Sequence, residues 1–552
     1  MSNWQLIAGT GLALLLAGSW SPPSQAAGTV TILMANDTYR IGGVDGGQVG
    51  GVPRLRTLRA ELEQEAPDLL VLHAGDLLFP STLSRRFGGA QMIDLLNQLD
   101  GDAQGFDHRL WVTFGNHEFD RSRLHNAQDL QQRIRESDFN WLGTNLRFSQ
   151  DESGRPLVRA PQLHASALVT SGGVRVGLFS ITTNVQQPQY LDLIESPSEV
   201  ARRMTALLRQ QGAELVVALT HLRAQEDLAL LETLGPRGPD LIVGGHEHER
   251  QIHHASGHRL VIKADADLRS AGLIRARVDQ DGAIQISAEF PILDAAVAPD
   301  PAAQARVDAW EERFRGETCR SLQEPETCLT EPLGRSQVRL VGEELTIRRF
   351  ETNLGNFVAD QALATFQEQG AQVAFINSGS LRLNQDLPPG PITRERLLDL
   401  FAYPSPLVLL KLDGATLQRI LERAVQDWTG NGWWLQIAGF AFRQDPSDER
   451  AYDLTLLTPE GPRPMRPDET ILAVTSQFLV DPSRGQDGYT MIDPAWQVTP
   501  VRQAPDLRDQ VANALRQAEP TGIAPVLQGR ICNDAHPGPC LAVPSGDTPR
   551  AP

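Results

Sequence analysis

Short apolar runs alternate with segments of helical periodicity from residue 29 to about residue 290. Short apolar runs bounded by turn residues predict strands, and apolar residues that recur every three or four positions predict helices. The alternation therefore predicts a layered α/β domain. The expected strands are "TVTILMA" (29–35), "DLLVLHAGD" (68–76), "RLWVTFGN" (109–116), "VRVGLFSIT" (174–182), "ELVVALTHL" (214–222) and "DLIVGGHEH" (240–248), and the expected helices are "RLRTLRAELEQE" (54–65), "AQMIDLLNQL" (90–99) and "SEVARRMTALLRQQ" (198–211).

Polar residues of a few types follow the carboxyl ends of these apolar runs. Loops at that edge of an α/β sheet converge on one crevice, so we expect the side chains to meet there. Glycines beside them permit the sharp turns that this requires. The residues are Asp37, Asp76, Asn116, His117, His221, His246 and His248.

A second pattern begins past residue 336, with helices expected over 354–369 and 414–428 and strands over 371–379 and 407–412. A chain of 552 residues exceeds what one hydrophobic core usually supports, so we expect two domains. Between the two patterns, the Pro- and Ala-rich segment "DAAVAPDPAAQARVDAWEERFRGETC" predicts a connector that contains a helix.

The composition changes this picture only slightly. A hydrophobic content of 41% and a charged content of 21% are ordinary for a soluble globular protein. The formal net charge of −18 argues against binding of a nucleic-acid polymer, which needs clustered Lys and Arg. A small anionic substrate stays possible where metal ions or a few arginines supply positive charge.

The N-terminus predicts export. An apolar segment from about Leu6 to Ala17 precedes the small-x-small series Ser24-Gln25-Ala26, although no Lys or Arg stands before it. This segment is too short for a comfortable membrane span, and no stretch of about 18 apolar residues occurs elsewhere, so we expect a periplasmic or secreted protein without a membrane span. The cysteines form two sequence-local pairs that suit disulfides in an oxidising compartment, Cys319 with Cys328 and Cys532 with Cys540.

Five segments together resemble the calcineurin-like metallophosphoesterases: "NDTY" (36–39), "AGDLLFPS" (74–81), "FGNHEFD" (114–120), "LTHL" (219–222) and "GGHEHE" (244–249). The resemblance implies a four-layered α/β sandwich that holds two divalent ions, from among Mn, Zn, Co, Fe or Mg. It implies that Asp76 bridges the two metals, with Asp37 and His248 on one and Asn116, His221 and His246 on the other. His117, paired with Asp120, would meet the phosphoryl oxygen.

Each of these residues alone has a plainer interpretation. A single Asp or Asn after a strand is usually a turn or a helix cap, and a single His is usually a satisfied polar group. The joint pattern in one family order favours the metal site. His73, His253 and His254 fit no position of the pattern, so we expect them to be structural.

Tyr39 stands where many members of the family carry a metal-binding histidine. A phenol with a reference pKa of about 10 is a poor ligand unless a metal deprotonates it. We therefore expect Tyr39 to line the site by hydrogen bonding, which leaves the first metal with one protein ligand fewer. A bacterial branch with Asp-x-Tyr resembles this sequence.

The second half resembles the C-terminal domain of secreted 5′-nucleotidases and UDP-sugar hydrolases through "RRFETNLGNFVADQAL" (348–363), "INSGSLR" (376–382), "LFAYPSPLVLLKLDG" (400–414) and "TSQFLVDPSRGQDGYTM" (475–491). The resemblance implies a nucleotide-binding domain in which Tyr403 and Phe478 sandwich the base. It implies that Arg348 and Arg382 approach phosphate oxygens, and that Asn377 and Asp487 contact base or ribose. The alternatives are ordinary packing for the aromatics and an exposed ion pair for Arg348, with Arg349 able to exchange roles with it.

The sequence as a whole predicts a two-domain α/β protein with a smaller C-terminal domain. The expected parts are a signal peptide (1–26), the metallophosphoesterase domain (27–298), a helical connector (299–335), the substrate-binding domain (336–532) and a tail (533–552). The leading hypothesis is an exported, monomeric 5′-nucleotidase that acts on nucleoside monophosphates. The alternatives are a 2′,3′-cyclic-nucleotide phosphodiesterase, a nucleotide-sugar pyrophosphatase, and a nucleotide-binding protein that lost catalysis with Tyr39.

Overall fold

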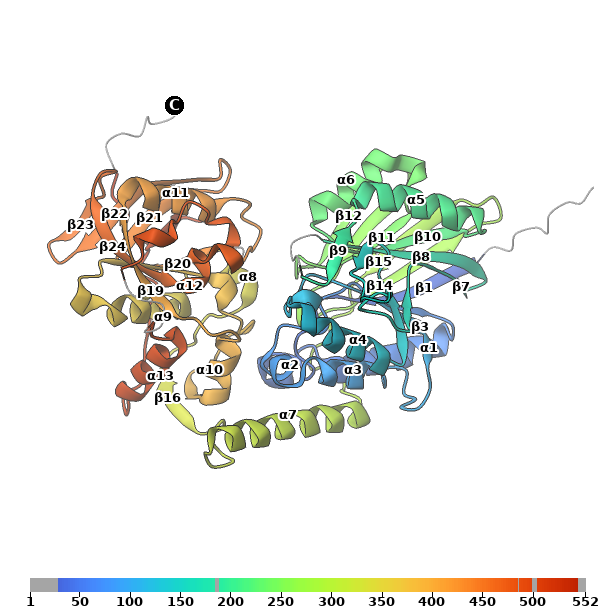
Figure 1. The fold of residues 1–552 in the computed structure, drawn as a ribbon, viewed down its shortest axis with the longest axis horizontal. Helices are drawn as coiled ribbons and strands as arrows, with labels where there is room; N and C mark the ends of the chain where they lie inside the picture. The colour runs from blue at the N-terminus through green and yellow to red at the C-terminus, as the bar shows by residue number, and fades with distance from the viewer. Residues whose placement is uncertain (1–27, 184–187, 485, 499–503, 545–552) are drawn as a thin grey trace, which may run out of the picture.

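A computed structural model of the chain describes residues 28–544, except 184–187, 485 and 499–503. Two α/β bodies lie side by side, and the long helix α7 (Pro301–Leu322) runs along one edge between them (Figure 1). The predicted leader, residues 1–26, and the end of the predicted tail lie outside the described residues. None of the described helices is long and apolar enough to cross a membrane.

The first sheet of the N-terminal body has seven strands in the order β15–β14–β1–β2–β3–β4–β6. β1, β2 and β3 run parallel, so their carboxyl ends lie at the same edge. The bounds are β1 Gly28–Ala35, β2 Leu70–His73, β3 Asp107–Thr113, β4 Phe139–Leu142, β6 Leu163–His164, β14 Gly272–Val278 and β15 Ile284–Glu289.

The second sheet has six strands in the order β12–β13–β11–β10–β8–β7. Its central strands β8, β10, β11 and β13 also run parallel, which gives a second edge of carboxyl ends. The bounds are β7 Ala167–Ser171, β8 Val174–Thr182, β10 Leu215–His221, β11 Leu241–Gly244, β12 Gln251–Ala255 and β13 Arg259–Lys263.

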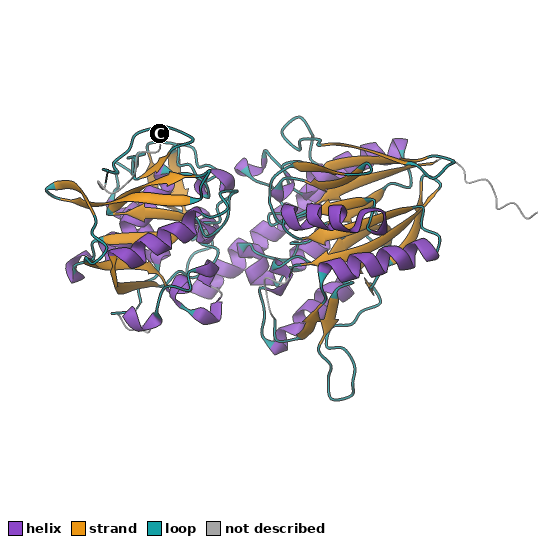
Figure 2. Cartoon of the chain, turned by 90° about the horizontal axis from the view of Figure 1, so that it is seen from above, coloured by secondary structure: helices purple, strands orange, loops and turns teal. Residues whose placement is uncertain are grey.

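The two sheets pack face to face through fully buried residues such as Ile32, Leu72, Val217 and Ile262. Helices α1 (Val52–Glu65), α3 (Ala90–Leu96) and α4 (Ala127–Glu136) pack on the first sheet, and α5 (Pro197–Gln210) and α6 (Ala224–Leu234) pack on the second. Figure 2 shows helices on both outer sides of the strands of this body. Strands buried on both faces explain why the sequence reads as continuous apolar runs. The expected four-layered sandwich is confirmed.

Helix α7 starts where the sequence changes to "DPAA". The Asp300 side chain accepts a hydrogen bond from the Ala303 N–H, and Pro301 occupies the first turn, where its missing N–H costs nothing. The helix packs on α1 and α3 of the N-terminal body. A Cys319–Cys328 disulfide joins its last turn to the following loop, as expected.

The C-terminal body contains two four-stranded sheets, β19–β24–β17–β20 and β23–β22–β21–β25. Helices α9 and α13 pack on one side of the first sheet and α11 on the other. The Cys532–Cys540 disulfide closes the last described segment. The bounds are β16 Pro332–Ser336, α8 Glu344–Ile347, α9 Asn353–Thr365, β17 Val373–Asn377, β18 Gly390–Thr393, α10 Arg394–Leu400, β19 Leu407–Asp413, α11 Gly414–Val425, β20 Leu435–Ala438, β21 Phe440–Asp445, β22 Arg450–Thr458, β23 Gly461–Pro464, β24 Thr470–Ser476, α12 Gln477–Val480, α13 Leu507–Gln517 and β25 Ile531–Asn533.

All the strands and helices expected by residue range are present, but several end earlier than expected. The strand expected over 240–248 stops at Gly244 because His246 and His248 adopt left-handed backbone conformations, which a strand cannot contain. The strand expected over 68–76 stops at His73 for the same reason, since Asp76 has a φ of 57°. The helix expected over 354–369 ends at Thr365, because Phe366 leaves the helical region at φ −120°.

Candidate metal centre

The loops that follow β1, β2 and β11 deliver side chains to one point between the two sheets. Asp37, Asp76, His246 and His248 all have positive φ, between 48° and 88°. Such a backbone is uncommon for residues with a side chain and persists only where the surroundings enforce it. The strain here coincides with residues that the sequence singled out as ligands.

Two glycines let the loops approach one another. Gly75 has a φ of 87°, and a Cβ on it would lie 2.9 Å from His221 Nδ1. A Cβ on Gly115 would collide with the carboxylate of Asp76. Only glycine fits at these two positions, so the "AGD" and "FGN" turns are tied to the packing of the site.

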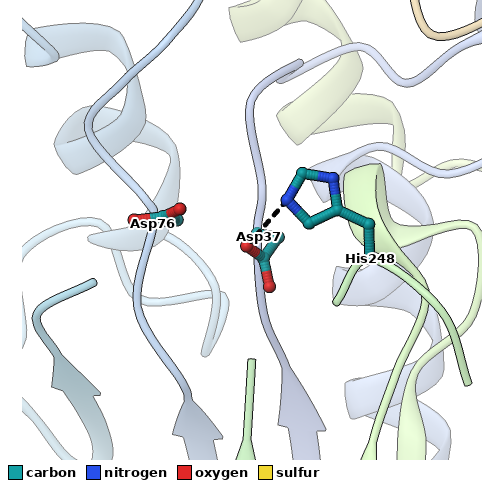
Figure 3. Close-up of side chains that lie close together, drawn as sticks. All are labelled: Asp37, Asp76 and His248. Atoms are coloured by element: carbon teal, nitrogen blue, oxygen red, sulfur yellow. Dashed lines mark ion pairs between the residues drawn. The ribbon is translucent and has the colours of Figure 1, made fainter. Parts of the chain in front are cut away.

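Three predicted ligands form the tightest group. One ligand atom each from Asp37, Asp76 and His248 lies within 4.8 Å of the other two, and His248 Nε2 lies 3.1 Å from Asp37 Oδ1 (Figure 3). Burial would raise the pKa of Asp76, but the neighbouring His221 and His117 outweigh it and lower the pKa to about 2. Both carboxylates are buried, which makes an additional cation favourable.

The remaining predicted ligands are Asn116, His221 and His246. His221 Nε2 is 3.2 Å from Asp76 Oδ2, and His246 Nδ1 is 3.2 Å from Asn116 Oδ1. The rings of His221 and His246 have their centres 5.1 Å apart. The structure therefore brings the other five predicted ligands together around Asp76.

His221 provides the test of whether a metal fits. Its Nδ1 lies 2.8 Å from the Ala74 carbonyl oxygen, which accounts for one ring nitrogen. Its Nε2 is fully buried without a hydrogen-bond partner in the described part of the chain, although it faces the carboxylates of Asp76 and Asp37. A histidine held by a backbone carbonyl, with its second nitrogen aimed at two carboxylates, is a typical metal-ligand arrangement. The donor set suits a divalent ion such as Mn²⁺, Zn²⁺ or Fe²⁺.

Tyr39 lies inside the tight group. Its hydroxyl is 3.0 Å from Asp37 Oδ1, 3.2 Å from Asp76 Oδ2 and 2.8 Å from His248 Nε2. Burial, together with the charges of the two aspartates, holds the pKa of the phenol well above its usual value. The hydroxyl therefore contacts three predicted ligands at once.

The predicted catalytic pair is also formed. His117 Nδ1 lies 2.9 Å from Asp120 Oδ1, and the His117 backbone N–H donates to Asp76 Oδ1 at 2.7 Å. Burial would lower the pKa of the imidazole, but the charges of Asp120 and Asp76 outweigh it and raise the pKa. His117 Nε2 lies 4.0 Å from Asp76 Oδ2, on the side of the predicted metals.

Glu118 was not singled out from the sequence, although it lies within "GNHEFD". Its buried carboxylate accepts hydrogen bonds from the backbone N–H groups of Asp76, Leu77, Leu78 and Gly115, at 2.5 to 2.9 Å. Burial is the largest of the effects that raise its pKa to about 7. The residue fixes the loop that carries Asp76 against the loop that carries Asn116.

The six predicted metal ligands, called the metal group below, lie at a cleft of about 700 Å³ between the two bodies. The N-terminal body contributes Asp76, Asn116, His117, Asp120, His246 and His248 to its lining, and the C-terminal body contributes Arg348, Asn377, Arg382, Tyr403, Phe478 and Asp487. Every substrate-binding residue predicted from the sequence therefore faces the same cleft. Asp37, Tyr39 and His221 lie buried behind it.

The polar residues on the C-terminal wall are held by one another. Asn377 Nδ2 donates to Asp487 Oδ2 at 2.9 Å, and Arg382 Nε donates to the Gly379 carbonyl oxygen at 2.8 Å. Arg348 is 8% exposed and pairs with Glu344, so the alternative of an exposed surface ion pair does not describe it. Arg349 instead pairs with Glu249, which lies outside the residues that line the cleft.

Two aromatic features of the cleft were not foreseen. The Tyr403 hydroxyl donates to Asp120 Oδ2 at 2.6 Å, so this predicted stacking residue also contacts the predicted catalytic pair. Trp433 lines the cleft with the Arg423 guanidinium 4.0 Å from its ring centre.

His253, expected to be structural, lies in the cleft wall, while His73 is buried behind the metal group, 3.0 Å from Thr38 Oγ1.

Comparison with known families gives two matches that follow one another along the chain. Residues 30–250 match the calcineurin-like phosphoesterase family, and residues 332–494 match the 5′-nucleotidase C-terminal domain. The first range contains every predicted metal ligand. The second contains every predicted substrate-binding residue.

Individual relatives agree with these matches at low identity. The trifunctional nucleotide phosphoesterase protein YfkN of Bacillus subtilis is 25% identical over 516 residues, which cover 86% of this chain but 33% of YfkN, so the chain spans about a third of that protein. A snake venom 5′-nucleotidase of Naja atra is 23% identical over 521 residues, which cover 84% of this chain and 91% of the venom protein. The structure of a 5′-nucleotidase precursor from Thermus thermophilus superposes with a TM-score of 0.74 at 23% identity, over 92% of this chain and 100% of that chain, and supports the fold.

Proposed function

The chain is a metallophosphoesterase with a 5′-nucleotidase C-terminal domain, and from this premise we propose that it hydrolyses the 5′-phosphate ester of nucleoside monophosphates. It is a metal-dependent phosphoester hydrolase by family. The finer assignment rests on one observation: a single cleft is lined by the metal group on one wall and by the predicted nucleotide-binding residues on the other.

The proposed centre holds two divalent ions. Asp37, Asp76 and His248 would hold the first, and Asp76, Asn116, His221 and His246 would hold the second, with Asp76 shared. When bound, such a pair of ions supplies an activated water at neutral pH and offsets the charge that builds on the phosphoryl oxygens. The buried Nε2 of His221, which faces two carboxylates, supports this assignment.

His117 and Asp120 are proposed to handle the leaving oxygen. His117 lines the cleft, and Asp120 lies 2.9 Å from its Nδ1 and so orients the ring, with Nε2 4.0 Å from Asp76 Oδ2. An imidazolium in that position can stabilise charge on the phosphoryl group or donate its Nε2 proton to the departing ribose oxygen. The pair therefore serves as an oriented acid.

Arg348 and Arg382 are proposed to orient the phosphate, because a guanidinium donates two parallel hydrogen bonds to phosphate oxygens. Both arginines line the cleft on the wall opposite the metal group. Tyr403 and Phe478 are proposed to stack on the base, and Asn377 with Asp487 to contact base or ribose. Stacking of this kind contributes about 1 to 3 kcal/mol per base.

A nucleotide sugar is a second candidate substrate. The cleft continues beyond the metal group to Trp433, Arg223 and Gln251, and its volume of about 700 Å³ leaves space past a single phosphate. An aromatic face flanked by a cation could accept a second moiety across a pyrophosphate. The reaction would use the same predicted metal site.

Export is proposed as well. The two disulfides fit an oxidising compartment, and residues 1–26 have the pattern of a cleaved signal. Expression of the full chain with a periplasmic fractionation assay tests this directly. A mature protein that starts near residue 27 in the periplasm or medium supports export, whereas a full-length cytoplasmic protein contradicts it.

The test of activity is phosphate release from 5′-AMP by the purified protein, after chelation and after separate addition of Mn²⁺, Zn²⁺, Mg²⁺ or Co²⁺. We expect no release from the chelated protein and restored release with at least one ion. Parallel assays with a nucleotide sugar and a 2′,3′-cyclic nucleotide rank the alternatives. Tight binding of AMP with no turnover under any ion would instead indicate a binding protein and overturn the proposal.

A further inference from the structure

One carboxylate of the C-terminal body reaches a predicted metal ligand of the N-terminal body. Glu344 is the first residue of α8, and its Oε1 lies 2.9 Å from Nδ1 of His248, as an ion pair across the domain interface. Both residues are largely buried, with side-chain exposures of 7% and 8%. Water therefore screens this contact little.

The contact occupies the outer side of the imidazole. On its other side, His248 Nε2 lies 3.1 Å from Asp37 Oδ1 and 2.8 Å from the Tyr39 hydroxyl, within the predicted metal group. Metal-binding histidines generally pair their second nitrogen with a carboxylate or carbonyl, which fixes the tautomer and the ring orientation. For His221 that partner is the Ala74 carbonyl, from the same domain. For His248 the carboxylate at that distance comes from the other domain.

The same oxygen of Glu344 also contacts an arginine that is proposed to bind phosphate. Arg348 Nη2 lies 2.6 Å from Glu344 Oε1, one helical turn further along the chain. Arg348 lines the cleft. One carboxylate oxygen therefore joins a residue proposed to bind phosphate to a residue proposed to bind metal.

We propose that Glu344 is a positioning residue for His248, so that the metal position of Asp37, Asp76 and His248 is complete only when the C-terminal domain is seated as in this structure. This inference rests on the proposed metal centre. It applies to the first metal position because the proposed ligands there include His248 as their single histidine, with the Tyr39 hydroxyl 2.8 Å from its Nε2. The second position takes both its histidines from the N-terminal domain.

Coupling between phosphate binding and metal binding follows from the shared carboxylate of Glu344. A phosphate that pairs with Arg348 favours the seated domain, and the seated domain presents Glu344 to His248. Linkage requires the reverse as well, so metal at the first position strengthens phosphate binding by the same factor. Loss of Glu344 should reduce this mutual effect.

The experiment measures Mn²⁺ binding to the metal-free full-length mature protein by calorimetry and by electron paramagnetic resonance, with and without inorganic phosphate. We expect two sites in the unmodified protein, with the weaker one tightened by phosphate. In Glu344→Gln we expect the weaker site to lose about 10- to 100-fold in affinity, the range found for outer partners of metal ligands, while the tighter site changes less than twofold.

Asp399→Asn is the matched control. Asp399 also pairs across the interface, 3.3 Å from Arg40 Nη1, but Arg40 is not a predicted metal ligand. We expect both Mn²⁺ affinities of this variant to stay within twofold of the unmodified protein. Glu344→Asp keeps the charge and shortens the reach, so it should weaken the same site as Glu344→Gln and serves where the amide variant does not fold.

The outcomes separate this inference from the proposed function. If the unmodified protein binds no Mn²⁺, the metal centre itself is wrong. If it binds two ions and either foldable Glu344 variant binds them equally well, the metal centre stands and the role of Glu344 is overturned. If Asp399→Asn weakens Mn²⁺ binding at the same site as much as Glu344→Gln does, the role of Glu344 is also overturned. Any contact across the interface would then support the site equally well.

Discussion

The Tyr403 hydroxyl of the C-terminal body lies 2.6 Å from Asp120 Oδ2, and Asp120 Oδ1 lies 2.9 Å from His117 Nδ1. Asp120 is therefore held from both sides, by the histidine that it orients and by a residue 283 positions away in the chain. A carboxylate fixed in this way cannot rotate without losing one of the two contacts. The position of the second domain thus bears on the geometry of the proposed acid.

Removal of this hydroxyl tests that relationship. Tyr403→Phe keeps the ring and deletes the donor, so we expect kcat for AMP to fall up to about tenfold, as a hydrogen bond to a charged group contributes about 1.5 kcal/mol or more. KM should change little because the aromatic face remains. Tyr190→Phe, which deletes a buried hydroxyl bonded to the Arg121 carbonyl, is the control. An unchanged kcat in Tyr403→Phe would show that Asp120 needs no support from the C-terminal body.

Loss of the aromatic face should have the opposite kinetic signature. Phe478→Ala is expected to raise KM for AMP about tenfold with little change in kcat, because base stacking contributes about 1 to 3 kcal/mol. Tyr403→Ala should raise KM and also lower kcat, because it deletes the hydroxyl that contacts Asp120 together with the ring. A small aryl phosphate lacks the nucleoside, so its KM in Phe478→Ala should stay near that of the unmodified protein. Equal losses on both substrates would contradict a stacking role for Phe478. Phe106→Ala, at an exposed position outside the cleft, controls for general effects.

Asp76 is the residue on which the proposed centre depends most. It contacts Tyr39, the His117 backbone and His221, and it belongs to both proposed metal positions. Asp76→Asn should lower AMP hydrolysis by more than about 100-fold, because metal stabilisation of the transition state is worth several kcal/mol. Near-normal turnover in this variant, measured with saturating Mn²⁺, would remove the bridging role.

The sequence predicted the architecture, and it predicted which side chains meet at one edge of the sheets. Apolar runs such as 174–182 and 214–222 correspond closely to β8 and β10, because a strand buried on both faces leaves an unmistakable run. The loop residues after these runs were predicted to meet because the carboxyl ends of parallel strands gather their loops, and the family resemblance proposed them as metal ligands. The apolar runs and the polar residues that follow them are local properties, which a sequence displays directly.

Contacts between distant segments could not be predicted. Glu118 contacts the Asp76 loop across about 40 residues, Glu344 reaches His248 across the domain interface, and Tyr403 reaches Asp120 from the far half of the chain. Neither composition nor periodicity encodes which buried carboxylate meets which loop. Such pairings depend on the packing of the two bodies against each other, which only the fold defines.

The phenol at position 39 can be replaced by an imidazole. The Tyr39 hydroxyl contacts Asp37, Asp76 and His248, so an imidazole placed there would add a nitrogen ligand to this group. We expect Tyr39→His to tighten Mn²⁺ or Zn²⁺ binding at the weaker site at least about tenfold, measured by competition with a chelator. Tyr39→Phe adds no donor and should not tighten it. A Tyr39→His variant no tighter than the unmodified protein would show that the phenol already serves as well as a histidine.

His73 gives a prediction for stability rather than activity. The side chain is 3% exposed behind the metal group, and its Nδ1 has no hydrogen-bond partner among the described residues. Burial lowers the pKa of this histidine from its usual 6.5 to about 4. Between pH 6.5 and about pH 4, the unfolded chain therefore binds a proton at this residue that the folded protein does not bind.

The sign of the effect follows from that difference. Above about pH 6.5 both states hold a neutral His73, so the folded state incurs no penalty there. As the pH falls from 6.5 toward 4, the unfolded chain is protonated first, and this residue lowers the free energy of unfolding by roughly 3 kcal/mol in all. In chelated protein unfolded by urea, His73→Gln should therefore lose less stability than the unmodified protein over this interval. A stability difference between the two that stays constant from pH 7 to pH 4 would mean that His73 is already solvated in the folded state.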